Sequence, residues 1–426
     1  MGFFQSFALV LTVTALFGFV NERWIKLPTP IGVTLVALLT SLGLLIFGGP
    51  GLRHWADGFL GSLDFGTLVL QGLLSFLLFA GSLHVNLEDL GRQGWPILVL
   101  ATVGVLLSTL VVGGLAYVGV GLLGYHLPLT WALVFGALIS PTDPIAVLGI
   151  LRRLGVRHDV ETLVVGESLF NDGVGVVVFL AALNLATAAS GHGGGSEAAL
   201  TLFVREALGG LALGFVLGVV TFLLLREVDQ YTVEVLLTLA LVAGGYALAE
   251  ATHMSGPLAM VVAGLFIGNR GRLLAMSATT REHLDTFWEL VDEILNAILF
   301  VMIGLEVVVL AHGYPWTAAL LAIPLVLLAR LTSAGVAITA LRARWHFPAW
   351  TVRTMVWGGL RGGISVALAL SLPTGSERDL IVSMTYAVVV FSILVQGLTV
   401  SRVARRIPAE PERLRSAGET EGGRGP

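Results

Sequence analysis

The chain has 426 residues, of which 56% are hydrophobic and only 12% charged, and its mean hydropathy is +0.90. Soluble domains carry about 25% charged residues, so this composition excludes an ordinary soluble protein. The net charge of −4 favours no nucleic-acid partner, and the absence of cysteine excludes disulfides, thiolate metal sites and thiol nucleophiles.

Apolar segments of about 20 residues, the length that crosses a hydrocarbon layer of roughly 30 Å, recur along the whole chain. The sequence therefore predicts an all-α polytopic membrane protein with about 13 transmembrane helices. In chain order, the predicted spans are residues 4–21, 30–48, 66–84, 95–121, 129–150, 161–188, 200–225, 232–251, 257–269, 287–311, 316–341, 350–372 and 379–401. The first span lacks a basic leader and a small-residue cleavage site, so we expect it to be retained and not removed as a signal peptide.

Polar segments separate the predicted membrane domain from a C-terminal tail and interrupt it at one loop. Residues 1–401 form the predicted membrane domain. Residues 402–426 are rich in Gly, Glu and Arg and predict a short disordered cytoplasmic tail, and residues 189–197 predict a glycine-rich external loop.

Basic residues are distributed unevenly between the predicted loops. With the N-terminus outside, the inside loops hold Arg23, Lys26, Arg92, Arg152, Arg153, Arg157, Arg226, Arg270, Arg272, Arg281, Arg342 and Arg344. The outside loops hold little more than Arg53, Arg205 and Arg378. This asymmetry follows the positive-inside rule and predicts a cytoplasmic C-terminus. We expect the protein to span the plasma membrane.

The two halves of the chain are weakly similar. Residues 30–33 (PIGV) open the second span as residues 257–260 (PLAM) open the ninth, and residues 81–85 (GSLHV) resemble residues 304–307 (GLEV). We expect an inverted repeat of six helices, spans 1–6 and 8–13, with span 7 as connector. Inverted repeats are typical of transporters whose site lies at the repeat interface.

The strongest local pattern is residues 140–144 (SPTDP), which place Asp143 between two prolines inside an apolar span. Each proline removes a backbone donor, so the helix should break here. Broken backbone at membrane depth is tolerated where it lines a cavity or is covered by protein, and its freed carbonyls can bind an ion. The alternative is a proline kink in which Asp143 pairs locally.

The second pattern is residues 166–173 (GESLFNDG) in span six. At 100° per residue, Glu167, Ser168, Asn171 and Asp172 occupy an arc of about 140° on one helix face. Ionisable residues in mid-membrane are costly and therefore functional by default. The alternative is a polar face that only joins helices.

Two arginines lie at the same depth. Arg330 is in the middle of span eleven, and Arg361 is in the glycine-rich segment of span twelve. That glycine density predicts a second broken helix, the repeat equivalent of span five. Glycine could also serve close helix packing alone, but packing does not explain an arginine at this depth.

Three segments of the chain resemble the monovalent cation:proton antiporters, specifically the bacterial sodium/proton antiporters related to animal sodium/proton exchangers. They are residues 142–144 (TDP) with Asp143, residues 166–172 (GESLFND) and residues 358–373 (GGLRGGISVALALSLP). The resemblance covers essentially the whole membrane chain. It implies a mobile six-helix core that moves against a dimerisation domain, two crossed broken helices (spans five and twelve) and a homodimer.

The same resemblance assigns the site. It implies that Asp172 alternately binds the cation and the proton, that Asn171 is its partner, and that Asp143 and the Thr142 backbone complete a monovalent-cation site. Ser168 is a further implied ligand. Glu167 and Arg330 match a buried ion pair that holds the core together, and Arg361 lies in the second crossed helix.

One position departs from the family. Many relatives carry an acid in span three where this chain has Ala80, which puts a third carboxylate ligand and the cation preference in doubt. His84 nearby could titrate near neutral pH and act as a sensor.

These residues predict an exchanger and not an enzyme. If Glu167 pairs with Arg330 and Asp143 is balanced by Arg361, Asp172 is left uncompensated and must be neutralised by a proton or by a sodium ion. Mutual exclusion at one carboxylate suffices for antiport, with Na⁺ (or Li⁺ or K⁺) and H⁺ as the transported ions and no cofactor. With Asn171 beside Asp172 we expect electroneutral one-for-one exchange.

Other readings stay open at this point. A potassium/proton antiporter would use the same residues, and half-helix N-termini could serve an anion carrier. A channel would need a continuous selectivity filter, and a membrane metalloprotease would need a motif such as HExxH, which the sequence does not contain.

Overall fold

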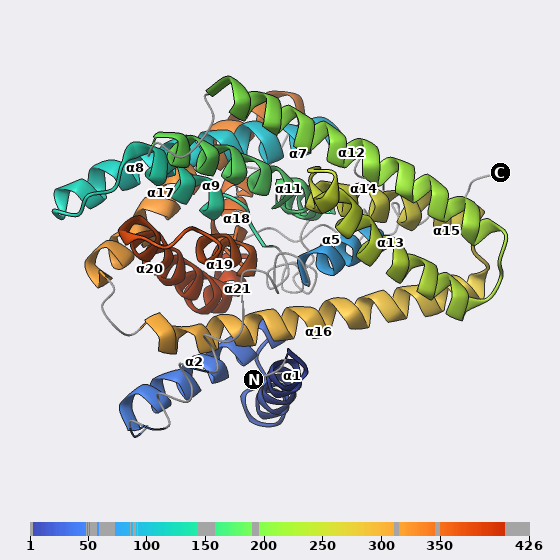
Figure 1. Cartoon of the computed structure of the whole chain (residues 1–426), viewed down its shortest axis with the longest axis horizontal. Coiled ribbons are helices and arrows are strands. Elements are labelled where there is room, and N and C mark those ends of the chain that lie inside the picture. The colour runs from blue at the N-terminus through green and yellow to red at the C-terminus, as the bar shows by residue number, and fades with distance from the viewer. Residues whose placement is uncertain are drawn as a thin grey trace.

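The computed structural model describes residues 3–47, 73–85, 93–143, 158–189, 196–310, 315–345 and 350–404, together with a few single residues between them. These ranges are helical almost throughout, and the helices pack into one bundle (Figure 1). In chain order they are α1 (Phe3–Val20), α2 (Thr29–Phe47), α5 (Leu74–Leu83), α7 (Gly94–Val99), α8 (Val105–Leu122), α9 (Leu129–Ile139), α11 (His158–Ala189), α12 (Ser196–Arg226), α13 (Tyr231–Ala251), α14 (Gly256–Phe266), α15 (Arg272–Leu274), α16 (Ala278–Leu310), α17 (Trp316–Trp345), α18 (Thr351–Gly358), α19 (Gly363–Leu370), α20 (Ser376–Phe391) and α21 (Gly397–Ala404).

Four π-helical turns extend or join these helices. They are η1 (Asn21–Ile25) after α1, η3 (Leu100–Gly104) between α7 and α8, η4 (Ile267–Gly271) after α14 and η5 (Ser392–Gln396) between α20 and α21. Turns of this kind inside α-helices occur frequently at functional sites. Of the four, η5 contacts the site described below.

Eight segments of the described chain are long and apolar enough to cross a membrane. They are Phe7–Ile25, Thr29–Phe47, Gly94–Leu122, Val160–Ala188, Arg205–Arg226, Tyr231–Ala251, Trp316–Leu341 and Ser376–Val403. Leu74–Leu83 and Leu129–Ile139 are shorter apolar helices. The protein is therefore an all-helical multi-pass membrane protein, and the exact count of 13 spans stays a prediction.

Helix ends differ from the predicted ones where polar residues continue a helix beyond its apolar part. α16 begins at Ala278 and not at residue 287, because its first turns are amphipathic and hydropathy does not detect them. The predicted loop 189–197 is wrong at both ends, since α11 extends to Ala189 and α12 begins at Ser196.

The predicted tail likewise starts inside a helix, because α21 continues to Ala404. Residues 405–426 lie outside the described residues. So do residues 66–72 of the third predicted span and residues 144–150 of the fifth.

Two close contacts at glycine join the first half of the bundle to the second. A Cβ at Gly304 of α16 would lie 2.5 Å from the Cβ of Ala37 in α2, and a Cβ at Gly268 of η4 would lie 2.0 Å from the carbonyl oxygen of Leu83 in α5. Only glycine permits such close approach. The second predicted span thus packs on the tenth, and the ninth packs on the third.

The end of α9 and the gap between α18 and α19 meet in the middle of the bundle. α9 ends at Ile139, and the chain is non-helical from Ser140 to Asp143. Likewise α18 ends at Gly358 and α19 begins at Gly363. The backbone N–H of Asp143 donates to the carbonyl oxygen of Leu360 at 2.8 Å, so the breaks are joined by a main-chain hydrogen bond.

Candidate functional site

The first break follows from its prolines. In a continuous helix the carbonyl oxygens of Ala137 and Ser140 would accept from residues 141 and 144, and both are proline without an N–H. The carbonyl of Ala137 accepts instead from the N–H of Ser140 at 3.4 Å. The carbonyl oxygen of Ser140 is left for another donor.

Arg361 supplies that donor from the second break. Its Nη1 donates to the carbonyl oxygens of Ser140 at 2.6 Å and Pro141 at 2.7 Å. A cation at the C-terminus of half-helix α9 also offsets the partial negative charge of its dipole. Arg361 thus stabilises the broken end of α9 by hydrogen bonds and by charge.

The segment that carries Arg361 is itself fixed by η5. The backbone N–H of Arg361 donates to Oγ of Ser392 at 2.9 Å, and Nε2 of Gln396 donates to the carbonyl oxygen of Trp357 at 3.3 Å. Sequence reasoning missed Ser392 and Gln396. The only available signal was that both are polar residues within an apolar span.

The polar face of α11 contacts the first break. Nδ2 of Asn171 donates to Oγ1 of Thr142 at 2.9 Å, and Oγ1 of Thr142 lies 3.0 Å from Oγ of Ser168. These three side chains are at most 2% exposed. The Oδ1 atom of Asn171 is buried and has no hydrogen-bond partner among the described residues, which leaves an oxygen ligand available.

Asp143 and Asp172 differ from their neighbours in exposure. Both are partly exposed, whereas Thr142, Ser168 and Asn171 are buried. Asp172 lies within electrostatic range of Asp143, Glu167 and Arg361. The break in span five and the face of α11 therefore bring two carboxylates into electrostatic range of each other.

Glu167, on the same helix, forms a buried ion pair with Arg330. Its carboxylate oxygens accept from Nη1 and Nη2 of Arg330 at 2.6 and 2.8 Å, a bidentate pair with both side chains buried. Nε of Arg330 also donates to the carbonyl oxygen of Met355 in α18, at 3.3 Å. The pair thus links α11, α17 and α18, and Asn171 lies 3.5 Å from the same carboxylate.

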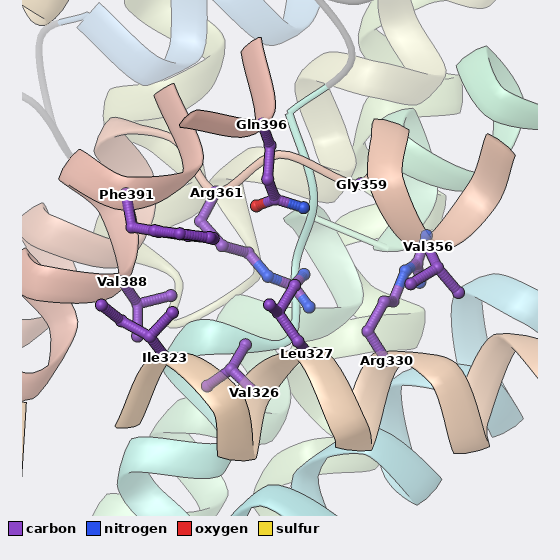
Figure 2. Close-up of a pocket in the computed structure, with 10 residues that line it drawn as sticks. All are labelled: Ile323, Val326, Leu327, Arg330, Val356, Gly359, Arg361, Val388, Phe391 and Gln396. Atoms are coloured by element: carbon purple, nitrogen blue, oxygen red, sulfur yellow. The ribbon is translucent and has the colours of Figure 1, made fainter. Parts of the chain in front are cut away.

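A small pocket lies behind the second break and is lined by both arginines (Figure 2). Its other lining residues are Ile323, Val326, Leu327, Val356, Gly359, Val388, Phe391 and Gln396. Arg330 extends from α17 toward Val356, and Arg361 extends toward Leu327 (Figure 2). Two guanidinium groups disfavour a cation in this pocket, so the cation is expected on the side of the carboxylates.

The structure shows the surroundings of Ala80, the residue in span three at which many relatives carry an acid. Ala80 is fully buried in α5 and offers only a methyl group. His84 is exposed at the end of this helix, and its Nδ1 donates to the carbonyl oxygen of Ala80 at 2.9 Å. This contact is local to α5, so nothing in it supports the predicted sensor role.

Gly362 sets how closely the second break approaches Asp143. A Cβ at this position would lie 2.6 Å from Oδ2 of Asp143. Because the backbone of Gly362 is extended (φ −112°), alanine would suffer no backbone strain and would act only by displacing the carboxylate. We expect Gly362→Ala to raise the KM for the transported cation by roughly ten- to a hundredfold, since displacements of about 1 Å can have effects of this size.

The measurement is cation-dependent transport in proteoliposomes. Gly335→Ala is the matched control, because a Cβ there would meet only Cγ1 of Val352 at 3.9 Å. If Gly362→Ala transports with the KM of the unmodified protein, the close approach to Asp143 has no functional role.

Comparison with known proteins gives consistent similarities. Residues 9–406 match the family described as "Sodium/hydrogen exchanger, transmembrane". The chain is 51% identical over 419 residues to the Na⁺/H⁺ antiporter NhaP of Pseudomonas aeruginosa, covering 96% of this chain and 98% of that protein. It is 35% identical to the Na⁺/H⁺ antiporter NhaH of Halobacillus dabanensis, covering 95% and 99%.

A solved structure shares the fold. The sodium proton antiporter MjNhaP1 of Methanocaldococcus jannaschii, determined at pH 8, superimposes with a TM-score of 0.74 at 20% identity. The match covers 95% of this chain and 98% of MjNhaP1.

Proposed function

This chain belongs to the sodium/hydrogen exchanger family, and from that premise we propose that it exchanges sodium ions for protons at Asp143 and Asp172. It is a transporter and not an enzyme, and it needs no cofactor. One observation carries the proposal. The carboxylates of Asp143 and Asp172 are partly exposed at the break after α9, whereas the polar side chains around them are buried and hydrogen-bonded.

The charges around the breaks determine what the site must bind. Three carboxylates (Asp143, Glu167 and Asp172) surround two guanidinium groups (Arg330 and Arg361). With the pair Glu167–Arg330 satisfied and Arg361 bonded to carbonyl oxygens, one negative charge is in excess. A net charge is costly inside a low-dielectric bundle, so the site is expected to hold one proton or one monovalent cation before it moves.

Asp172 is the residue at which the two ions exclude each other. We assign it the alternating role, with Asp143, the Thr142 backbone, Ser168 and Asn171 as oxygen ligands to the cation. The unpartnered Oδ1 of Asn171 supports this assignment. Because a proton and a sodium ion cannot occupy one carboxylate together, binding of either lowers the affinity for the other, and exchange follows.

The similarity to Na⁺/H⁺ antiporters and the charge of the site support sodium as the transported cation. Proteins 51% and 35% identical are named Na⁺/H⁺ antiporters, which favours sodium over potassium. The surplus of carboxylates argues against an anion carrier. A single clustered site, without a ring of repeated groups, argues against a channel.

The proposal also covers the number of spans, the repeat and the orientation of the chain in the membrane. We assign 13 spans with an inverted repeat, supported by the reciprocal packing of α2 on α16 and of η4 on α5. A mobile core around the two breaks would move against a dimerisation domain in a homodimer within the cell membrane. The distribution of arginines supports an outside N-terminus and a cytoplasmic C-terminus.

The test is transport in proteoliposomes of the purified protein. Sodium is added under a proton gradient and proton movement is followed with a pH-sensitive dye, with potassium as the comparison ion. Sodium-driven proton movement supports the proposal, whereas a response to potassium alone supports the potassium/proton alternative. No response to either ion contradicts both.

The stoichiometry gives a separate prediction. Since Asn171 cannot carry a second proton, the loaded forms with one proton and with one sodium ion have equal charge. We expect exchange to be electroneutral, so the initial rate should not change when valinomycin and potassium set the membrane potential at about 0 or −100 mV, a difference worth about 2.3 kcal/mol per transported charge. A rate that follows the potential would contradict one-for-one exchange.

A further inference from the structure

The long helix α16 carries a polar stripe that the site described above does not use. α16 runs across the molecule between α2 and the helices that surround the breaks (Figure 1). At 100° per residue, Asp285, Glu289, Asp292 and Asn296 lie within an arc of about 60°, so they follow one another along a single face. Leu299, one turn further on, continues this face.

This face leads to the second break. A Cβ at Gly363, the first residue of α19, would lie 2.3 Å from Cδ1 of Leu299, so α16 and the break are in direct contact there. The preceding residue, Gly362, is the one that approaches the carboxylate of Asp143. Among charged groups, Asp143 has the largest electrostatic effect on Asp292. The stripe therefore ends beside the central site.

The stripe begins with solvent-accessible carboxylates and ends at a buried amide. Asp285 is 27% exposed and forms an ion pair with Arg272, Glu289 is exposed, Asp292 is partly buried, and Asn296 is only 3% exposed. The negative charges thus lie between the surface and the buried amide. Such a row raises the local concentration of cations.

The Asn296 amide is the observation that points to a ligand. This amide group interacts with the carboxylate of Asp292 across one helical turn, and its Oδ1 is buried without a hydrogen-bond partner among the described residues. A buried amide oxygen without a partner is costly. A carboxylate and an unpartnered amide oxygen about 6 Å apart along one helix are suitable ligands for a partly hydrated alkali cation.

We infer that Asp292 and Asn296 form a second cation site on α16, at which sodium waits before it reaches Asp143 and Asp172. The inference rests on the proposed function. The pocket lined by Arg330 and Arg361 disfavours a cation, whereas the α16 face carries carboxylates that attract one. On the proposed orientation α16 begins at the cytoplasmic side, so the site serves that side alone.

The test compares the KM for sodium from the two sides of the membrane. In everted vesicles, which expose the cytoplasmic face, Asp292→Asn should raise the KM about tenfold, the lower end of the concentrating effect of a charged cleft, with little change in the maximal rate. In right-side-out vesicles the KM should stay the same. Glu227→Gln is the control, since this carboxylate is exposed after the end of α12 and is not among the charged groups that act on Asp292.

A second variant separates a binding role from a folding defect. Asn296→Asp adds a charge to the site and should lower the cytoplasmic KM, a change that misfolding cannot produce. An unchanged KM in Asp292→Asn, an equal increase from both sides, or no decrease in Asn296→Asp would overturn the inference while exchange itself persists. Absence of sodium-driven exchange in the unmodified protein would overturn the proposed function as well.

Discussion

Replacing Asp172 with asparagine is expected to abolish sodium-driven proton movement, to the level of liposomes without protein. Asparagine has nearly the same shape, so the packing of α11 against the first break should persist. It can neither release a proton nor neutralise a cation, and the charge that the site holds in excess is gone. The measurement is dye-monitored proton flux in proteoliposomes, with the thermal unfolding of the purified variant recorded in parallel.

Asp379→Asn is the matched control for this variant. Asp379 is an exposed aspartate in the first turn of α20, away from both breaks, and its substitution should leave transport unchanged. Sodium-driven flux in Asp172→Asn above the protein-free level would show that the alternating carboxylate is a different one. Asp143 would then be the next residue to replace.

Breaking the buried ion pair is expected to produce the largest loss of stability. Arg330→Met removes both donors to Glu167 and leaves a buried carboxylate without its countercharge. Removing one partner of a buried pair costs about 3–5 kcal/mol. We expect the melting temperature in detergent to fall by roughly 5 °C or more.

The double variant Glu167→Gln/Arg330→Met distinguishes charge from packing. Exchanging both members of a buried pair for neutral residues is often nearly neutral, so the double variant should recover much of the lost stability. Recovery should be incomplete, because the bond from Arg330 to the carbonyl of Met355 is also lost. Equal melting temperatures for the single and double variants would mean that the uncompensated charge of Glu167 is not the cause.

The helical membrane fold and the grouping of the site residues could be predicted in part from local patterns, whereas the roles of those residues came from the family resemblance. Pro141 and Pro144 remove donors at known positions, so the break in span five follows from backbone chemistry alone. The helical spacing of Glu167, Ser168 and Asn171 likewise fixes which groups share a face. Both patterns involve residues that are close together in the sequence.

What the sequence could not supply were contacts between distant segments. The spacing of residues did not show that Arg361 donates to the carbonyls of Ser140 and Pro141, since the two breaks are about 220 residues apart. The interpretation that Arg361 balances Asp143 was made from charge alone, and the structure adds carbonyl oxygens as its acceptors. Ser392 was missed for the same reason.

The start of α16 shows a different limit. Hydropathy detects only the apolar part of a helix, so the polar turns before residue 287 were left out of the predicted span. Those turns carry Asp285 and lead to Asp292. Asp292 and Asn296 lie inside the predicted span 287–311, but hydropathy did not show that they share a helix face with Asp285.

The central claim is that one sodium ion and one proton compete for Asp172, and it is tested most directly by counting protons released when sodium binds. Purified protein in weakly buffered detergent solution is titrated with sodium, and bound sodium and released protons are measured together at a pH where the site is protonated. We predict about one proton released per sodium ion bound, and neither binding nor release in Asp172→Asn. Sodium binding without proton release would contradict mutual exclusion at this carboxylate and with it the proposed mechanism of exchange.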